Sequence, residues 1–298
     1  MKELYDDGDA MFFANIGRLD KPMTKADWLQ QTRTSLFAHN TQQQELTRLD
    51  IGKELDLSGV GGRMIDVLKE LGYQTSSTTI ASPTAFATGS PKRANYVTTL
   101  PRAEPLAFNM VAETDDMDQL LIDLNSLGEI DSSVFLEQWS SNLVQGIAES
   151  RLTVDIFPTD GISNKFESAA TWIKSRSERN VERDLIFIQH PGWDHHNMNG
   201  QNNLETKLPE LIGAMAAFVE ELKAQNVWDH VVIMSGSDFG RTLTHNSRGG
   251  TDHAWAGNNF MMDSGLQGGI IHGKYPTDFS ENGDWKNWAR STDPDIAE

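Results

Sequence analysis

Aspartate and histidine side chains gather in three short runs in the last third of the chain. The runs are His190-Pro191-Gly192-Trp193-Asp194-His195-His196, then Ser237-Asp238-Phe239-Gly240-Arg241, and then Gly249-Gly250-Thr251-Asp252-His253. Imidazole nitrogens and carboxylate oxygens together suit a divalent ion of the zinc, iron or manganese type. On spacing alone, the alternative is a set of hydrogen-bonded loop ends that hold no metal.

A strand–helix–strand unit is predicted to position these runs. Residues 184–189 and 231–234 are short apolar segments typical of buried strands. A βαβ unit makes its two strands parallel neighbours, and ligands bind beyond the carboxyl ends of such strands. We therefore expect an α/β protein with a mostly parallel sheet sandwiched between helices. The intervening helix, 204–225, carries one apolar face: Leu208, Leu211, Ile212, Met215, Phe218 and Leu222.

The rest of the chain predicts further elements of the same fold. The glycine-rich run Ser58–Arg63 is interpreted as the start of a helix and not as a phosphate cradle, because it lacks the Lys-Ser/Thr ending of a P-loop. Because no internal repeat or long linker divides the sequence, we expect a single domain over residues 1–298. Strands are expected at 10–16 and 78–80, and helices at 60–71, 117–127, 134–147 and 166–177.

The composition excludes several classes of protein. The chain has 25 Lys and Arg against 43 Asp and Glu, a net charge of −18, which disfavours nucleic-acid and anionic-lipid surfaces as partners. The absence of cysteine excludes disulfides, thiolate zinc sites and a cysteine nucleophile. No apolar run reaches the length of a membrane span, and the Gly-x-Ser-x-Gly motif of serine hydrolases does not occur.

Around these runs the sequence resembles the bacterial family called domain of unknown function 1501, a branch of the alkaline phosphatase-like superfamily. Three motifs carry the resemblance in the expected order, within residues 187–196, 237–242 and 249–255. Further matching stretches are Leu4–Met11 and Ala38–Gln43, and residues 268–269 and 273–276. The resemblance implies an alkaline phosphatase-like fold and the hydrolysis or transfer of phosphate, sulfate or phosphonate esters.

The resemblance also implies a set of metal ligands. Asp194, His196 and His253 are similar to the ligands of a first ion, and Asp238 is similar to a ligand of a second. The ions would be zinc, manganese or calcium, and the substrate a small-molecule or glycan ester. Three further roles follow: Asp252 is a ligand or a partner that orients His253, His195 lies beside the ligands, and Arg241 pairs with the substrate oxyanion or ties down its loop.

The nucleophile is where this chain departs from the family pattern. Family members usually carry a serine before the histidine of the Ala38–Gln43 stretch, but this chain has Ala38. Ser35, Thr34 and Thr41 are the nearby hydroxyls, and none is preferred by its motif. The superfamily also often has Asp-His at the position of Asp238-Phe239.

The ends of the chain suggest a longer protein. Family members usually begin with an export signal and then a strand that ends in Gly-Gly-Asn-Asp, whose aspartate resembles another metal ligand. We therefore expect a chain truncated at both ends, with a full-length form that is exported to the periplasm or beyond. The leading hypothesis is a metal-dependent hydrolase of phosphate or sulfate esters. The alternatives are an inactive relative that binds a metal or a glycan, and an inactive fragment.

Overall fold

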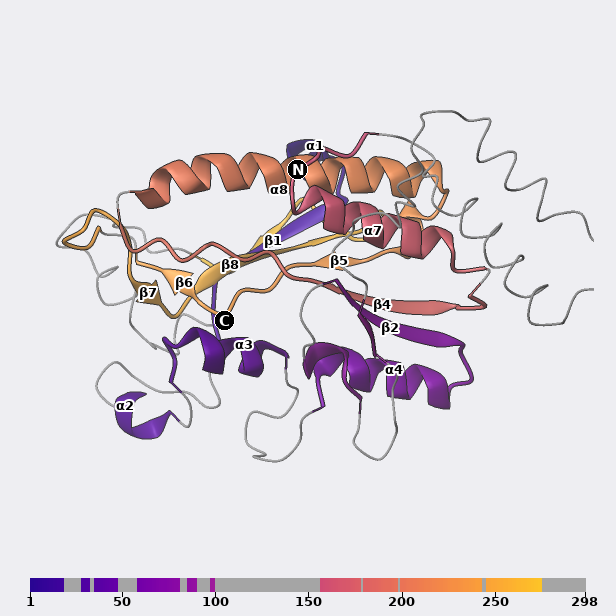
Figure 1. The fold of residues 1–298 in the computed structure, drawn as a ribbon, viewed down its shortest axis with the longest axis horizontal. Coiled ribbons are helices and arrows are strands. Elements are labelled where there is room, and N and C mark those ends of the chain that lie inside the picture. Colours follow the sequence, from indigo (N-terminus) through magenta and orange to yellow (C-terminus); the bar gives the residue numbers. More distant parts are fainter. Residues whose placement is uncertain are drawn as a thin grey trace, which may run out of the picture.

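The protein is a mixed α/β structure in which strands form three sheets between helices (Figure 1). The computed structural model describes residues 1–18, 28–32, 35–47, 58–80, 85–89, 97–99, 156–177, 179–197, 199–242 and 245–274. The helices predicted at 117–127 and 134–147 lie outside these residues.

The described helices are α1 Lys2–Asp6, α2 Trp28–Gln31, α3 His39–Thr47, α4 Val60–Glu70, η1 Ala85–Ala87, α7 Ser163–Lys174, α8 Asn199–Ala224 and η2 Trp228–His230. The strands are β1 Ala10–Ile16, β2 Thr75–Ile80, β3 Val97–Thr99, β4 Arg183–Ile188, β5 Ile233–Met234, β6 Gly240–Arg241, β7 His253–Ala254, β8 Gly257–Met262 and β9 Ile271–His272.

The sheets combine parallel and antiparallel pairs, so the prediction of a mostly parallel sheet is wrong for the described residues. The largest sheet has the order β5-β8-β1-β9, in which β8 runs antiparallel to both β5 and β1, while β9 runs parallel to β1. A second sheet, β3-β2-β4, is entirely parallel. The third consists of the short antiparallel pair β6-β7.

The predicted βαβ unit has the right elements but the wrong pairing. Strand β4 lies parallel to β2, from Thr75 opposite Arg183 to Ile80 opposite Ile188. Strand β5 instead pairs antiparallel with β8, with Ile233 opposite Met262. A short apolar run indicates that a strand is buried, but it carries no information about which strand lies beside it. The two strands therefore share helix α8 without being neighbours in one sheet.

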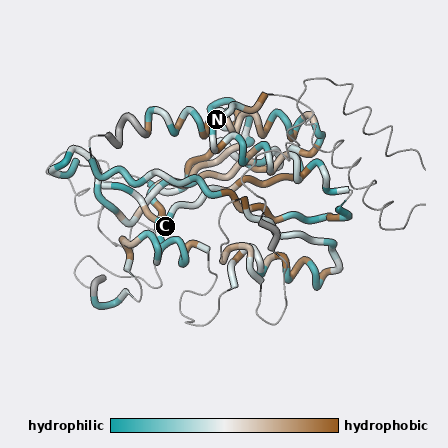
Figure 2. Tube along the Cα trace, viewed as in Figure 1, coloured by the Kyte–Doolittle hydropathy of each residue, from teal (hydrophilic) through white to brown (hydrophobic). Residues whose placement is uncertain are grey.

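One hydrophobic core joins the strands to α7 and α8, which cover the same side of the sheets (Figure 1). The rings of Phe166 in α7 and Phe218 in α8 lie 5.2 Å apart between their centroids. Figure 2 shows the apolar stretches running along the strands in the middle of the molecule. The most buried core side chains come from all of these elements: Ala10, Ile80, Ala170, Ala214, Leu222 and Met262.

Helix α8 buries only part of its predicted apolar face. Met215, Phe218 and Leu222 are buried as expected, but Leu208 is 46% exposed and Ile212 is 43% exposed. Within residues 204–224, the first buried position of α8 is Ala214, and the partly buried Leu211 also packs against the core. Although α8 has 26 residues, neither it nor any other helix in the described part of the chain is apolar enough to cross a membrane.

Helix α4 packs against the parallel sheet through glycines. A Cβ atom at Gly62 would lie 2.1 Å from the backbone of Thr88, and one at Gly61 would lie 2.5 Å from the side chain of Leu185. The N–H of Gly59 donates to the Thr88 carbonyl at 2.8 Å, and the helix begins at the next residue. The glycine-rich run is therefore a helix start that permits close packing, as the sequence predicts.

Asp160 closes the first turn of α7, and its replacement by alanine tests this role. Its carboxylate accepts hydrogen bonds from the backbone N–H groups of Ile162 and Ser163 at 3.0 and 2.9 Å, and from the Ser163 hydroxyl at 2.8 Å. We expect Asp160→Ala to lower the free energy of unfolding by about 1 kcal/mol, the usual value of a helix cap. Urea unfolding measures the change, and Asp7→Ala, at an exposed aspartate, is the control with the same loss of charge. Equal stability of the two variants would contradict the capping role.

Candidate metal centre

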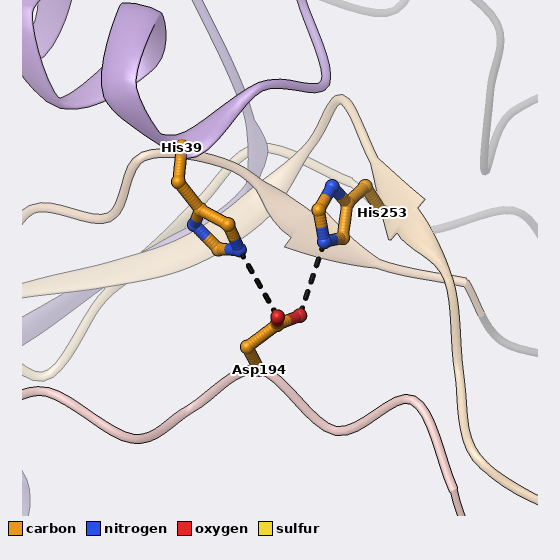
Figure 3. Close-up of side chains that lie close together, drawn as sticks. All are labelled: His39, Asp194 and His253. Carbon is orange, nitrogen blue, oxygen red and sulfur yellow. Dashed lines mark hydrogen bonds and ion pairs between the residues drawn. The ribbon is translucent and has the colours of Figure 1, made fainter.

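Three side chains from distant parts of the sequence converge on one point (Figure 3). His39, Asp194 and His253 each offer one ligand atom, and these atoms all lie within 4.8 Å of one another. The Nε2 atom of His39 lies 3.4 Å from Oδ2 of Asp194, and Nε2 of His253 lies 3.0 Å from Oδ1. Two imidazoles and one carboxylate form a ligand set of the kind that holds catalytic zinc, with a coordination position left open.

Two of the three residues begin a regular element, and the third lies in a loop. His39 is the first residue of α3, Asp194 lies in the loop that follows β4, and His253 is the first residue of β7. In the β6-β7 pair, Arg241 lies directly opposite His253. Because opposed residues of an antiparallel pair point to the same face, both side chains reach toward Asp194.

Both imidazoles are oriented by hydrogen bonds on the far side of the ring. Nδ1 of His39 donates to Oδ2 of Asp238 at 2.5 Å, and Nδ1 of His253 donates to the Phe37 carbonyl at 2.7 Å. Metal-binding histidines usually donate their second ring N–H to a carboxylate or a backbone carbonyl in this way. The acceptors fix the tautomer and the ring direction, so both Nε2 atoms face the carboxylate of Asp194.

This orientation directs both Nε2 atoms at carboxylate oxygens. With Nδ1 protonated, a neutral imidazole carries a lone pair on Nε2, so each Nε2 atom needs a proton, as in the hydrogen bond between His253 and Asp194, or a metal cation on its side of the ring. His39 Nε2 is also buried and has no hydrogen bond within the described residues. Lone pairs and carboxylate oxygens repel one another unless a proton or a metal cation lies between them. The donor set therefore fits a divalent cation.

Phe239 forms an apolar wall behind the two imidazoles. Its ring centroid lies 4.6 Å from that of His39 and 4.3 Å from that of His253, and the residue is buried. The side chain thus packs against both candidate ligand rings. A phenyl ring at this place restricts their rotation and keeps water from one side of the centre.

Asp194 is held in its charged form by its neighbours. Partial burial raises the pKa of Asp194, but hydrogen bonds with His253 and Arg241 and the charge of His196 outweigh it and lower the pKa to about 2. Nη1 of Arg241 donates to Oδ1 of Asp194 at 2.6 Å, and its Nε donates to the Thr251 hydroxyl at 3.2 Å. Arg241 therefore ties the loop and Asp194 together, which is one of the two roles predicted for it.

His196 lies at the edge of the three-residue group. Its Nε2 atom is 2.8 Å from Oδ1 of Asp194 and 2.8 Å from Nε2 of His253. Its Nδ1 atom lies 3.4 Å from Oδ1 of Asp252, which also accepts a hydrogen bond from Asn246 at 3.0 Å. The sequence predicts that Asp252 binds the metal or orients His253, but in the structure Asp252 faces His196.

The two histidine-bearing loops are joined through their backbones. A Cβ atom at Gly250 would lie 2.2 Å from the backbone nitrogen of Asn197, so only glycine allows this approach. Beside it, the N–H of Thr251 donates to the His195 carbonyl at 2.8 Å. Asn246 accepts from the N–H of Gly250 at 3.1 Å and donates to the His196 carbonyl at 3.2 Å. This backbone network, rather than the ligands themselves, sets the distance between Asp194 and His253.

His195 is part of this junction but not of the ligand group. The residue is buried, and burial, followed by the charge of Arg241, lowers the pKa of its imidazole. Its ring lies 6.5 Å from that of Trp193, and its Nε2 atom has no hydrogen bond in the described part of the chain. His195 thus contributes a backbone acceptor to the loop junction and a neutral ring to the interior.

The structure brings together most of the predicted metal ligands and adds one. Asp194, His196 and His253 lie within hydrogen-bonding distance of one another, while Asp238 is one step away, behind His39. The sequence prediction does not name His39 as a candidate ligand. The sequence signal for His39 was the Ala38–Gln43 stretch, which resembles the family. In that stretch the prediction concerned the residue before the histidine, a possible nucleophile, and not the histidine.

The predicted hydroxyl nucleophiles do not gain a role from the described contacts. Ser35 is exposed, and its carbonyl accepts a hydrogen bond from the Gln42 amide at 2.9 Å. The Thr41 hydroxyl lies 3.5 Å from the Asn40 side chain. Thr34 lies outside the described residues. The identity of the nucleophile therefore stays a prediction, and the described geometry prefers none of the three hydroxyls.

The lowered pKa of Asp194 predicts a pH dependence of stability in metal-free protein. Because this pKa falls from 3.8 to about 2 on folding, the contribution of the charged group is present above pH 3.8 and is lost as the pH falls toward 2. We expect the difference in the free energy of unfolding between wild type and Asp194→Asn to shrink over this range. The effect is small, because 43% of the side chain is exposed. Urea unfolding with chelator at each pH measures it, with Asp7→Asn as control, and a difference that is constant with pH would contradict it.

The hydrogen bond from His39 to Asp238 predicts an indirect effect on metal affinity. Loss of such a partner typically weakens binding by about 10- to 100-fold. We expect Asp238→Ala to weaken zinc binding by this factor and Asp238→Asn, which keeps a hydrogen-bond acceptor, to weaken it less. Calorimetric titration with zinc compares the variants after circular dichroism has shown that they are folded. Unchanged affinity in Asp238→Ala would mean that His39 does not bind the ion.

Comparison with known proteins gives one match, to a family model. Residues 159–283 match the family described as "Protein of unknown function (DUF1501)", a segment that includes Asp194, His196, Asp238 and His253 but not His39. No curated protein matches the chain, and no solved structure matches it. Over residues 159–283 the comparison thus supports the resemblance to the domain of unknown function 1501 family that the sequence motifs indicate.

Proposed function

We propose that the protein is a metal-dependent hydrolase of phosphate or sulfate esters, with one divalent ion held by His39, Asp194 and His253. The observation that carries this proposal is the orientation of the two imidazoles, whose Nδ1 atoms are held by Asp238 and the Phe37 carbonyl while their Nε2 atoms face Asp194. Imidazole and carboxylate ligands favour zinc or manganese over calcium, which prefers oxygen ligands alone.

A divalent ion bound there would supply a Lewis acid for the ester oxygen and lower the pKa of a nearby water molecule. The residues of the chain supply the surroundings. The guanidinium of Arg241 neutralises part of the charge of Asp194, from 2.6 Å. Phe239 keeps one side of the centre dry, which strengthens the electrostatic interactions within it.

His196 lies at the edge of the three ligands and is suited to proton transfer. Its Nε2 atom is close to Asp194 and His253, while Asp252 lies near its Nδ1 atom and is suited to stabilise the protonated ring. We propose that His196 donates a proton to the leaving oxygen of the ester, the task of a general acid. The resemblance implies that His196 is a ligand of the first ion. If it bound the ion together with His39, Asp194 and His253, four protein ligands would close the coordination and the site would be structural.

A second candidate function is the binding of a metal or of an anionic ligand without turnover. It is favoured by the positions of the candidate nucleophiles: Ser35 is exposed with its carbonyl held by Gln42, and the Thr41 hydroxyl lies against Asn40. A site without an attacking hydroxyl would still bind a metal through its ligands. It could not carry out the nucleophilic attack on an ester.

One experiment separates the two functions. Zinc and manganese content is measured by elemental analysis on wild type and on Asp194→Ala/His253→Ala, followed by assays with 4-nitrophenyl phosphate and 4-nitrophenyl sulfate. We expect stoichiometric metal and turnover in wild type and neither in the double variant. The matched control is Asp229→Ala/His230→Ala, an exposed aspartate and histidine pair in η2.

The outcomes are distinct. Metal that disappears in the site variant, together with turnover of either ester, supports the hydrolase. Metal that disappears in the same way without turnover supports the binding function instead. A folded wild type that takes up no zinc or manganese would refute the hydrolase and the binding of a metal, and would leave only the binding of an anionic ligand.

A further inference from the structure

A single arginine connects three of the segments that surround the candidate metal centre. Arg18 follows strand β1, and its Nη2 atom donates to the carbonyl and the side-chain oxygen of Gln42 in α3, the latter at 3.1 Å. The same atom donates to the carbonyl of Asp238, between β5 and β6, at 3.1 Å. The Arg18 carbonyl accepts a hydrogen bond at 2.9 Å from Nε1 of Trp255, which lies two residues after His253. Arg18 thus contacts α3, the β5–β6 segment and the β7–β8 segment.

The contacts of the guanidinium lie beside the hydrogen bond that orients His39. Gln42 lies three positions after His39, so the two residues are neighbours on one face of α3. The carboxylate of Asp238 accepts from Nδ1 of His39 at 2.5 Å and from the Gln43 amide at 3.3 Å. The side chain of Arg18 therefore bridges the helix that carries His39 and the residue that orients its ring.

Both ends of this bridge are anchored. A Cβ atom at Gly17 would lie 2.5 Å from the ring of Trp255, so glycine allows the chain after β1 to approach the indole that holds the Arg18 carbonyl. At the other end, Gln42 is buried, and its amide donates to the Ser35 carbonyl at 2.9 Å. The guanidinium therefore connects two fixed parts of the structure.

The guanidinium is charged at neutral pH although Arg18 is partly buried. Burial lowers the pKa of Arg18 to about 10, against the charges of Glu45 and Asp238, which raise it. Hydrogen bonds from a charged donor are stronger than those from a neutral one. Lysine would keep the charge, but its side chain is shorter and lacks the planar fork of donors, so it would hold the two segments less firmly.

We propose that Arg18 is a positioning residue of the candidate metal centre, which holds α3 against Asp238 so that Nε2 of His39 faces Asp194. Within the described residues, none of the hydrogen bonds of Arg18 goes to a candidate metal ligand, so it acts through Asp238 and not on the ion. Its effect on metal binding rests on the proposed function, whereas its effect on the His39 ring needs no metal.

The first measurement follows the His39 ring in the full chain with chelator. Long-range proton–nitrogen NMR distinguishes the two tautomers of a neutral imidazole, and the His39 signals are identified by their absence in His39→Gln. We expect the proton to be on Nδ1 in wild type, because Asp238 accepts from that atom. We expect a mixture of tautomers in Arg18→Met, whose side chain donates no hydrogen bond.

Arg176→Met is the matched control. Arg176 is also partly buried, and its Nη1 atom donates to the Ile173 carbonyl at 3.1 Å, in α7. The control therefore removes a guanidinium of similar exposure from a backbone carbonyl outside the candidate centre. We expect it to leave the His39 tautomer unchanged.

The second measurement is zinc affinity by calorimetric titration. We expect Arg18→Met to weaken binding about tenfold, the lower end of the range for a residue that supports a ligand. In an Asp238→Ala background the same substitution should weaken binding little further, because both changes act on one imidazole and their effects are then not additive. Arg18→Lys is expected to lie between wild type and Arg18→Met, and it replaces Arg18→Met in both measurements if that variant does not fold.

The outcomes separate the inference from the proposed function. A wild-type His39 without a proton on Nδ1, or a tautomer that Arg18→Met leaves unchanged or Arg176→Met changes equally, would overturn the inference. With zinc bound, an unchanged affinity or a loss additive with that of Asp238→Ala would also overturn it. A wild type that binds no zinc refutes the hydrolase, and the His39 tautomer alone then decides the role of Arg18. A variant that is only less stable in urea, with tautomer and affinity unchanged, would make Arg18 merely structural.

Discussion

The carboxylate of Asp194 is the group on which the rest of the site depends. One of its oxygens is within 3.0 Å of Arg241, His196 and His253, and the other faces His39. These partners belong to α3, to the β4–α8 loop and to the β6-β7 pair, so a single negative charge joins residues as far apart in the sequence as His39 and His253. Its low pKa keeps that charge in place at all but strongly acid pH.

Backbone contacts around Asp194 position the candidate ligands independently of the contacts between their side chains. Gly250 lets the backbones of two loops touch, and Asn246 bonds to both of them. The hydrophobic core, by contrast, lies between the strands and helices α7 and α8. The core thus lies on one side of the sheets, while the candidate ligands lie in a loop and at the ends of elements that a rigid framework positions.

The candidate site was more predictable than the sheet order. Asp194, His196 and His253 were identified by the motifs that resemble the family, and such local motifs hold whichever strands become neighbours. The neighbour of β5 is β8, and this choice depends on contacts between residues such as Ile233 and Met262, which periodicity does not encode. The pattern that found the other ligands also passed over His39, because it begins a polar helix, far from any predicted strand. Only the fold brings its imidazole to Asp194.

The shortness of the β6-β7 pair affects how the contacts of Asp194 can be broken. Each strand contributes only two residues, and Arg241 and His253 are opposed in the ladder. A slip of one residue between the strands would place Arg241 and His253 on opposite faces of the ribbon. Asp194 would then lose either the imidazole of His253 or the guanidinium of Arg241. A pair of only two residues per strand therefore ties two of the contacts of Asp194 to a single choice of register.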